Sequence, residues 1–400
     1  MLNNALRAQR KEDHLRLAEQ SFRQHRHNDF DTMHLVRPTL PETCVDEQSL
    51  ATTLFGIPVA APFFINAMTG GTEHATQINA QLAAVAERER IAFAFGSASI
   101  VGHESEALAG FVHARELAPS VPVFINVNPA TPLDVVRTLI QELYPAALQV
   151  HINAVQELVM PEGDRDFHWS EGIERISAAV HEQWNIPVIA KEVGFGWDIA
   201  SMRRALECGV DVIDVAGSGG TNFAQIERLR RAEQQSSSAA SSAAVSAVDA
   251  ENHTASNISA DSEREADERA MSVDFSWLED AGLSTVQSLL NAQQVASELV
   301  SDSASHEFMY FGSGGVRHPL DVMKCLVLGA QAVGVSGVML HTVLEYGTDG
   351  LQELVRIWKH QLAGLVALYG MGSLQDAQHV QYWLDPSLES YQRQILHSMS

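Results

Sequence analysis

Apolar residues along this chain occur in short runs that alternate with segments of helical periodicity. The runs have the length and composition of buried strands. They lie at Pro62–Ile65, Ile91–Phe95, Val123–Ile125, Ala147–Ile152, Pro187–Ala190, Val210–Val215, Phe308–Phe311 and Ala332–Val335. Amphipathic helical patterns lie at Ile78–Arg88, Leu133–Leu143, Ile173–Gln183, Ile199–Cys208 and Leu320–Leu328. This alternation predicts parallel strands, and eight units favour a closed (β/α)8 TIM barrel over an open doubly wound sheet.

Polar and glycine residues follow every predicted strand. The strand ends read Asn66–Gly71, Gly96-Ser97, Asn126–Asn128, Asn153–Glu157, Lys191–Gly194, Gly217–Thr221, Ser313–Arg317 and Ser336-Gly337. One such loop is explained by the need to turn the chain. Eight such loops, each directly after a predicted strand, predict a shared site at the carboxyl ends of the strands, where barrel enzymes carry their active sites.

Three segments fall outside the barrel pattern. We expect an N-terminal arm over residues 1–51, a barrel over 52–375 and a C-terminal extension over 376–400. Residues 234–270 are rich in Ser, Ala and acidic side chains, which predicts a disordered insertion between the sixth and seventh strands. An acidic tether is the alternative. The one-faced helix Leu351–Leu368 is expected to close the barrel or to pack against a neighbouring subunit.

Composition restricts the partners. The chain is 46% hydrophobic and 19% charged, which is typical of a globular protein. Its 26 basic and 50 acidic residues give a net charge of −24, which disfavours nucleic acid and anionic lipid. An anionic ligand therefore needs local cations, backbone N–H groups or a metal. Three scattered cysteines, with no signal peptide and no membrane span, favour a cytoplasmic protein.

Two glycine-rich loops and a third short one predict a phosphate site. Gly217–Thr221 follows the sixth strand, Ser313–Arg317 the seventh and Ser336-Gly337 the eighth. Glycines allow backbone N–H groups to approach phosphate oxygens closely. Barrel enzymes often bind phosphate after strands seven and eight.

Lys191 ends the fifth strand and is expected to point into the barrel mouth, where a charge needs an anionic partner. The reduced isoalloxazine ring of a flavin carries negative charge near N1 and is the expected partner. A Schiff-base lysine and a solvated surface lysine are the alternatives.

The fourth strand alternates with period two, so that Gln149, His151 and Asn153 face one side and Leu148, Val150 and Ile152 the other. A lone histidine on a strand is usually structural. Together with Asn153, Gln156 and Glu157, however, His151 is better explained as part of a polar ligand shell. Glu157 is the best carboxylate there for Mg²⁺, which prefers one or two carboxylates plus phosphate oxygens.

The arm carries a basic pair in Arg10-Lys11-Glu12-Asp13-His14. Spacing alone favours a solvated helix face over a clamp on a diphosphate. His25, His27, Asp29 and Asp31 resemble a metal cluster, but neighbouring acids and bases favour a solvated surface turn.

Taken together, these residues resemble the flavin-dependent (type II) isopentenyl-diphosphate isomerases. The resemblance runs from Arg10 to the last strand and excludes the insertion. It rests on Arg10-Lys11 with His14, Leu40-Pro41-Glu42, Ile65–Gly71, His151–Glu157, Pro161–Phe167, Lys191–Gly194 and Asp214–Thr221.

The resemblance implies a set of site residues and shifts the basic pair to a substrate clamp. FMN would be held by Ala67, Met68, Thr69, Ser97, Asn126, Lys191, Ser218, Thr221, Gly315, Val316, Arg317, Ser336 and Gly337. Substrate would contact Arg10, Lys11, His14, His151, Asn153 and Gln156, and Glu157 would bind Mg²⁺. Gln156, Glu157 and Lys191 would serve catalysis, with Gln156 as a positioning or relay group because an amide is a poor acid. NADPH would reduce the flavin, and a tetramer or octamer is expected.

The implied reaction converts isopentenyl diphosphate to dimethylallyl diphosphate, with reduced FMN as acid and base. Two departures concern the flavin surroundings: Ala98-Ser99 stands where the family often has Gln-Arg, and Ser336-Gly337 replaces Ala-Leu. The rival function is an FMN-dependent 2-hydroxy-acid oxidase, whose family carries a His-Gly-Gly-Arg stretch. The equivalent loop here, Gly217–Asn222, lacks both His and Arg. A flavin-storing scaffold is the non-enzymatic alternative.

Overall fold

The computed structural model describes residues 2–22, 26–160, 162–234, 275–301 and 308–397. The predicted insertion at 234–270 lies outside these residues, apart from Gln234. Within the described part of the chain, no helix has the length and apolar character needed to cross a membrane.

Eight parallel strands close into a barrel, which confirms the predicted TIM-barrel class. Its strands are β4 (Phe63–Ile65), β5 (Phe93–Ser97), β6 (Val123–Val127), β7 (Ala147–Ile152), β8 (Val188–Glu192), β9 (Val212–Asp214), β10 (Met309–Ser313) and β11 (Ala332–Val335). Pairing of Val335 with Ile65 joins β11 to β4 and closes the ring. The bounds of β7 and β11 are those that the apolar runs predict.

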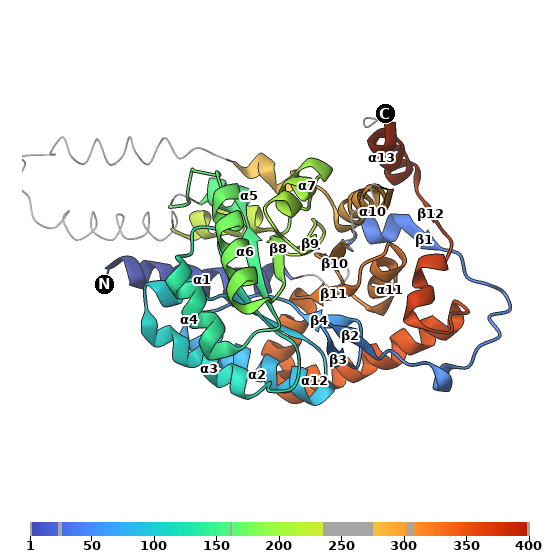
Figure 1. Cartoon of the computed structure of the whole chain (residues 1–400), viewed down its shortest axis with the longest axis horizontal. Helices are drawn as coiled ribbons and strands as arrows, with labels where there is room; N and C mark the ends of the chain where they lie inside the picture. The colour runs from blue at the N-terminus through green and yellow to red at the C-terminus, as the bar shows by residue number, and fades with distance from the viewer. Residues whose placement is uncertain (1, 23–25, 161, 235–274, 302–307, 398–400) are drawn as a thin grey trace, which may run out of the picture.

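Helices surround the strands (Figure 1). They are α2 (Glu73–Glu89), α3 (Leu108–Glu116), α4 (Leu133–Leu143), α5 (Ala154–Val159), α6 (Ser170–Trp184), α7 (Ile199–Glu207), a helix over residues 223–234, α10 (Thr285–Ser301), α11 (Pro319–Val327) and α12 (Gly337–Leu368). Local chemistry sets their ends. The Thr72 side chain accepts the N–H of Ala75 at the start of α2, and Asp198 accepts that of Ser201 at the start of α7. Gly347, at φ 66°, kinks α12.

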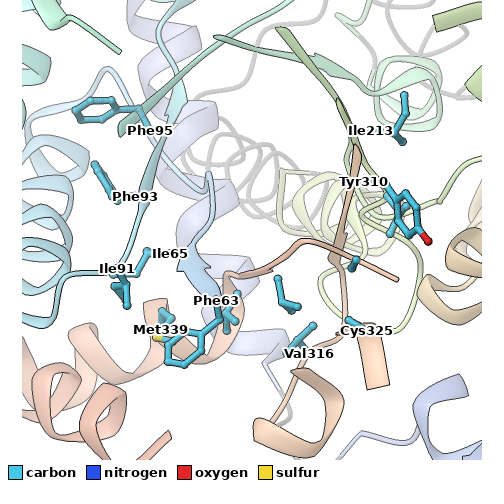
Figure 2. Packing of buried hydrophobic residues seen from close by; sticks show 14 of the residues in the cluster. Phe63, Ile65, Ile91, Phe93, Phe95, Ile213, Tyr310, Val316, Cys325 and Met339 are labelled. Carbon is cyan, nitrogen blue, oxygen red and sulfur yellow. The ribbon is translucent and has the colours of Figure 1, made fainter. Parts of the chain in front are cut away.

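Strand alternation produces two apolar regions. Side chains that face outward pack beneath the helices, as Phe63, Phe93 and Phe95 do in Figure 2. The Trp358 ring of α12 packs edge-on against Phe63 at 5.8 Å, so the predicted helix Leu351–Leu368 closes the barrel of its own chain.

Side chains that face inward fill the amino-terminal half of the barrel. Phe64, Phe124 and Phe311 meet there in edge-to-face and stacked contacts. The hairpin of β2 (Thr52–Leu54) and β3 (Ile57–Val59) plugs this end, because Phe55 at its turn contacts Phe124 and Phe311. We call this apolar filling the barrel floor.

The arm and the C-terminal extension meet in a two-stranded antiparallel sheet. Helix α1 (Leu2–Ser21) is followed by the 3₁₀ turn η1 (Asp29–Thr32) and by β1 (Met33–Leu35), which pairs with β12 (Tyr382–Leu384). Figure 1 shows β1 and β12 beside α10 and α13 (Pro386–His397), away from the start of α1. The division into an arm, a barrel and an extension stays a prediction.

Candidate functional site

A cavity of about 1090 Å³ opens at the carboxyl ends of the barrel strands. It exceeds the roughly 300–1,000 Å³ of common ligand pockets, which leaves room for two ligands side by side. Its wall includes Ala67, Met68, Thr69, Ser97, Asn126, His151, Asn153, Gln156, Glu157, Lys191, Thr221, Gly315, Val316, Arg317, Ser336 and Gly337. Arg10, Lys11 and His14 of α1 complete it. Ser218 is absent from the described wall, and its backbone N–H donates to the carbonyl of Leu283.

The glycine loops after β9 and β10 lie against each other at one side of the cavity. Gly219, Gly314 and Gly315 have φ of 119°, 93° and 68°, which a side chain would strain. The Asn28 Nδ2 of the arm donates to the carbonyls of Gly219 and Gly315, at 3.3 and 2.9 Å. The arm therefore ties the two loops together from outside the barrel.

Arg317 is held by acids and does not extend freely into the cavity. A guanidinium has five N–H donors, and here they go to Asp321, to Asp31 and to the carbonyl of Arg26. The hydrogen bond from Arg317 holds the pKa of Asp31 far below its usual range, against the effect of burial. Asp31 is exposed in the turn Asp29–Thr32, as predicted, and the pairing with Arg317, 286 positions away in sequence, adds a contact that the sequence did not predict.

Lys191 is buried at the end of β8 and points into the barrel, as the alternation predicts. Its Nζ donates to the carbonyl of Glu192 at 3.0 Å and lies 3.7 Å from the Asp214 carboxylate. It is thus neither a solvated surface lysine nor an uncompensated charge.

A layer of inward polar side chains lies above the barrel floor. Asn66, Asn126, Gln149 and Asp214 are buried and hydrogen-bonded to one another. His151 joins the layer through its Nδ1, 2.7 Å from Asn126 Oδ1. Burial lowers the pKa of His151 to about 4, and the charges of Lys191 and Lys11 act in the same direction.

Glu157 lies on α5 at the other side of the cavity. Its Oε1 accepts from Asn153 Nδ2 at 3.0 Å and its Oε2 accepts from the N–H of Asp164 at 2.8 Å. Asn153 Nδ2 also donates to Gln156 Oε1 at 3.2 Å. No group of three or more His, Cys, Asp or Glu able to hold a metal occurs among the residues that the structure describes.

Helix α1 covers the mouth and brings the basic pair to the cavity. Lys11 Nζ donates to the Gly70 carbonyl at 2.6 Å, and Arg10 lies 3.8 Å from Glu162. Since both side chains line the cavity, the interpretation as a solvated face is wrong.

The helix over residues 223–234 supplies acids that hold α1. His14 bonds to Glu227, and Arg230 pairs with both Glu227 and Glu162, at 2.8 and 2.9 Å. Burial opposes ionisation of Glu227, but the bond from His14 and the charge of Arg230 hold its pKa below the usual value.

Sequence reasoning gave no site role to Asn28, Asn66, Gln149 and Asp214. The strand pattern had placed Gln149 on the side of His151 and Asn66 at a strand end, and the same period-two pattern in β9 turns Asp214 inward. Asn28 gives no such signal, since its partners are loop carbonyls that lie far away in sequence.

The strands and helices define a parallel (β/α)8 barrel. The FMN-dependent dehydrogenase family matches residues 280–383. Among solved structures, a flavocytochrome b2 variant superposes with a TM-score of 0.61 at 17% identity, covering 94% of this chain and 84% of that one. A mandelate oxidase gives 0.56 at 14% identity, covering 94% and 98%. Likeness at such low identity establishes the fold alone.

Curated relatives define the family more narrowly. The chain is 33% identical to the isopentenyl-diphosphate delta-isomerase of Latilactobacillus sakei subsp. sakei (strain 23K), over 97% of this chain and 96% of the relative. It is 35% identical to the enzyme of that name from Limosilactobacillus reuteri subsp. reuteri (strain JCM 1112), over 97% of each. The chain belongs to the isopentenyl-diphosphate delta-isomerase family, in its FMN-dependent type II form, and is an isomerase.

Proposed function

We propose that the protein converts isopentenyl diphosphate to dimethylallyl diphosphate, with reduced FMN and Mg²⁺. The observation that carries this proposal is the meeting, in one cavity, of glycine loops, a buried lysine and a basic helix. A chain of net charge −24 would otherwise repel a diphosphate, so cations gathered at this one point favour an anionic ligand.

The cavity wall fits FMN. Thr69, Ser97, Asn126 and Lys191 surround its interior, and the glycine loops offer backbone N–H groups to a phosphate. Because Arg317 is occupied by Asp31 and Asp321, its contribution would come from its place in the loop and not from free guanidinium donors. Bound reduced FMN would supply acid–base chemistry at the alkene.

The surroundings of Glu157 fit a Mg²⁺ ion that keeps most of its ligands from water and phosphate. Each carboxylate oxygen accepts one hydrogen bond and retains a further lone pair. A single protein carboxylate with substrate phosphates is a common Mg²⁺ arrangement. The lack of a larger acidic cluster in the described residues agrees with an ion that arrives with the substrate.

The side chains divide the remaining tasks. Lys191 would offset negative charge on the reduced ring, and Arg10 and Lys11 would offset the diphosphate. Because His14 bonds to Glu227 through Nε2, its contact with the diphosphate would use Nδ1. Asn153 and Gln156 position groups by hydrogen bonding, since neither amide is an acid at neutral pH. Helix α1 over the mouth would exclude water from a cationic transition state.

The direct test uses purified, dithionite-reduced protein with isopentenyl diphosphate and Mg²⁺, followed by analysis of the prenyl product. Dimethylallyl diphosphate is expected, and oxidised enzyme without a reductant should form none. Activity of the oxidised enzyme in air would refute the flavin role. A colourless protein that takes up no FMN would overturn the whole proposal.

Glu157→Gln tests the metal assignment. The variant should weaken the Mg²⁺ dependence of activity while the flavin absorbance stays normal, because the amide removes the negative charge but keeps the shape. Glu171→Gln is the matched control, since Glu171 is exposed in the first turn of α6. An unchanged Mg²⁺ titration of Glu157→Gln would contradict the assignment.

The rival 2-hydroxy-acid oxidase keeps some support from the family match over residues 280–383. The cavity loop Gly217–Asn222 argues against it, because it offers neither a histidine base nor an arginine for a carboxylate. Turnover of lactate with release of peroxide would favour the rival. We also propose NADPH as the cellular reductant, a tetrameric or octameric assembly and a cytoplasmic location.

A further inference from the structure

A continuous hydrogen-bonded path crosses the polar layer from Asp214 to His151. Asn66 Nδ2 donates to Asp214 Oδ2 at 2.8 Å, and Gln149 Nε2 donates to Asn66 Oδ1 at 3.3 Å. Asn126 Nδ2 donates to Gln149 Oε1 at 3.2 Å, and Asn126 Oδ1 lies 2.7 Å from His151 Nδ1. We call the three amides of Asn66, Gln149 and Asn126 the amide relay.

The direction of this relay is fixed at its Asp214 end. A carboxylate only accepts hydrogen bonds, so the Asn66 atom that faces it is the nitrogen. A second contact agrees, because the backbone N–H of Ala67 donates to Asn66 Oδ1 at 2.8 Å. Gly334 leaves the space for this arrangement, since a Cβ there would lie 2.3 Å from Asn66 Nδ2.

Each amide transmits this orientation to the next. Asn66 presents its oxygen to Gln149, which must therefore turn its nitrogen toward Asn66 and its oxygen toward Asn126. Asn126 in turn presents its oxygen to the His151 ring. An oxygen acceptor requires a donor, so Nδ1 carries the proton.

The other ring nitrogen is then an acceptor. The ring is neutral, because burial lowers the pKa of His151 to about 4, with Lys191 and Lys11 acting in the same direction and the Val127 carbonyl acting against them. A neutral imidazole protonated at Nδ1 has a lone pair at Nε2. Because the ring lines the cavity, this lone pair is available to a ligand.

We propose that Asp214 is a positioning residue which, through the amide relay, holds His151 in its Nδ1–H form so that Nε2 accepts a hydrogen bond from a ligand hydroxyl or N–H group. A diphosphate oxygen is itself an acceptor and would be a poor partner for this nitrogen. The proposal therefore moves His151 from the substrate contacts that the resemblance implies to the hydroxyl and N–H groups of the flavin. Only this choice of ligand rests on the proposed function.

The tautomer can be measured on the full chain by ¹⁵N NMR of labelled histidines, with His151→Gln identifying the His151 signals among 17 histidines. At pH 7 we expect a protonated Nδ1 and an unprotonated Nε2, in a single form. A ring protonated at Nε2, or a mixture of both forms, would overturn the proposal whether or not the protein is an isomerase.

Variants then test the role of Asp214. Asp214→Asn supplies an amide that can also donate, which removes one of the two contacts that orient Asn66, so both relay directions and both tautomers should become populated. Ser313→Ala is the matched control: it removes a hydroxyl donor to Asp214 without touching the relay, and the wild-type tautomer should persist. A folded Asp214→Asn protein that keeps the single Nδ1–H form would refute the role of Asp214.

If Asp214→Asn does not fold, Gln149→Leu cuts the relay in its middle and should also mix the tautomers. Adding FMN to the wild-type chain should shift the Nε2 signal in the direction of an accepted hydrogen bond, whereas inorganic pyrophosphate should leave it in place. The reverse pattern would overturn the assignment of the ligand group. Neither titration depends on turnover, so a failed isomerase assay and a failed tautomer assignment are distinguishable.

Discussion

The barrel floor and the polar layer above it are built from the same strands and differ by two residues along each strand. Phe64 is followed two positions later by Asn66, Phe124 by Asn126, and Phe311 by Ser313. Two residues correspond to roughly 6 to 7 Å along a strand and preserve the inward direction. The period-two alternation thus determines which side chains point into the barrel. The position along the strand determines whether an inward side chain packs in the barrel floor or lies in the polar layer beside the cavity.

The two regions are also held together differently. The floor excludes water and gains its stability from contacts among aromatic rings. The polar layer contains Lys191 and Asp214, whose burial is tolerated only because hydrogen bonds and opposite charge compensate them. The floor should therefore dominate stability, and the polar layer should dominate ligand binding.

Phe311→Ala should have the largest effect on stability. The ring is fully buried among Phe55, Phe64 and Phe124, so its loss leaves a cavity that costs about 3 to 5 kcal/mol of unfolding free energy. Urea denaturation gives this value from the shift in midpoint. Phe167→Ala, at a side chain 41% exposed, is the control and should cost about 0.5 kcal/mol. Equal losses would show that the floor is not the stabilising region.

The same two regions differ in how well the sequence predicts them. The strands and their inward faces follow from short apolar runs and period-two alternation, and β7 shows this most clearly. The cavity residues after each strand were predicted for the same reason. The contacts of the arm were not, because the partners of Asp31 and Asn28 lie far along the chain and no local pattern encodes them. The orientation of the amide relay also needs three-dimensional distances.

Asp31→Asn should have the next largest effect on stability. It changes the side of the cavity where ion pairs of Arg317, and not aromatic contacts, hold the structure. Arg317 would lose one of its two carboxylates, which should cost about 2 kcal/mol, less than for a fully buried pair because Asp31 is 37% exposed. Weaker FMN binding should accompany this loss, because Arg317 belongs to a glycine loop.

Acid should act on the wild type in the same way. Since the pKa of Asp31 is lowered in the folded state, its contribution is present above the normal carboxyl range and is lost as the pH falls through and below that range. Asp29→Asn is the matched control, because Asp29 lies two residues away in the same 3₁₀ turn and the hydrogen bonds of Arg317 go to Asp31, Asp321 and Arg26. If Asp29→Asn and Asp31→Asn weaken FMN binding equally, the ion pair has no special role.

His151 should make the stability of the polar layer depend on pH, whereas the apolar side chains of the barrel floor do not titrate. Its folded pKa of about 4 lies below its ordinary value of 6.5, so the unfolded chain binds a proton first as the pH falls. The contribution of His151 to stability should therefore decrease between pH 6.5 and 4, by about 1 to 2 kcal/mol at pH 5.

Glu192 contributes with the opposite sign. Burial raises its pKa to about 8, so its contribution falls as the pH rises from 4.5 to 8. Comparing wild type with His151→Gln by urea denaturation at pH 7 and pH 5 cancels this term, because Glu192 is present in both. An equal pH dependence in the two proteins would mean that His151 does not titrate as expected.

The smallest effect on stability should come from an ion pair on the outer side of α1, because its side chains are exposed. Arg16 pairs with Glu233, but their side chains are 42% and 49% exposed, so water screens the charges. A double-mutant cycle with Arg16→Ala and Glu233→Gln should give a small coupling that shrinks further in high salt. The buried pair of Arg230 and Glu227 on the cavity side provides the contrast, because removal of Glu227 leaves a guanidinium only 7% exposed with one acid fewer. A coupling between Arg16 and Glu233 as large as that of the buried pair would mean that α1 is fixed over the mouth from its outer side as firmly as from within.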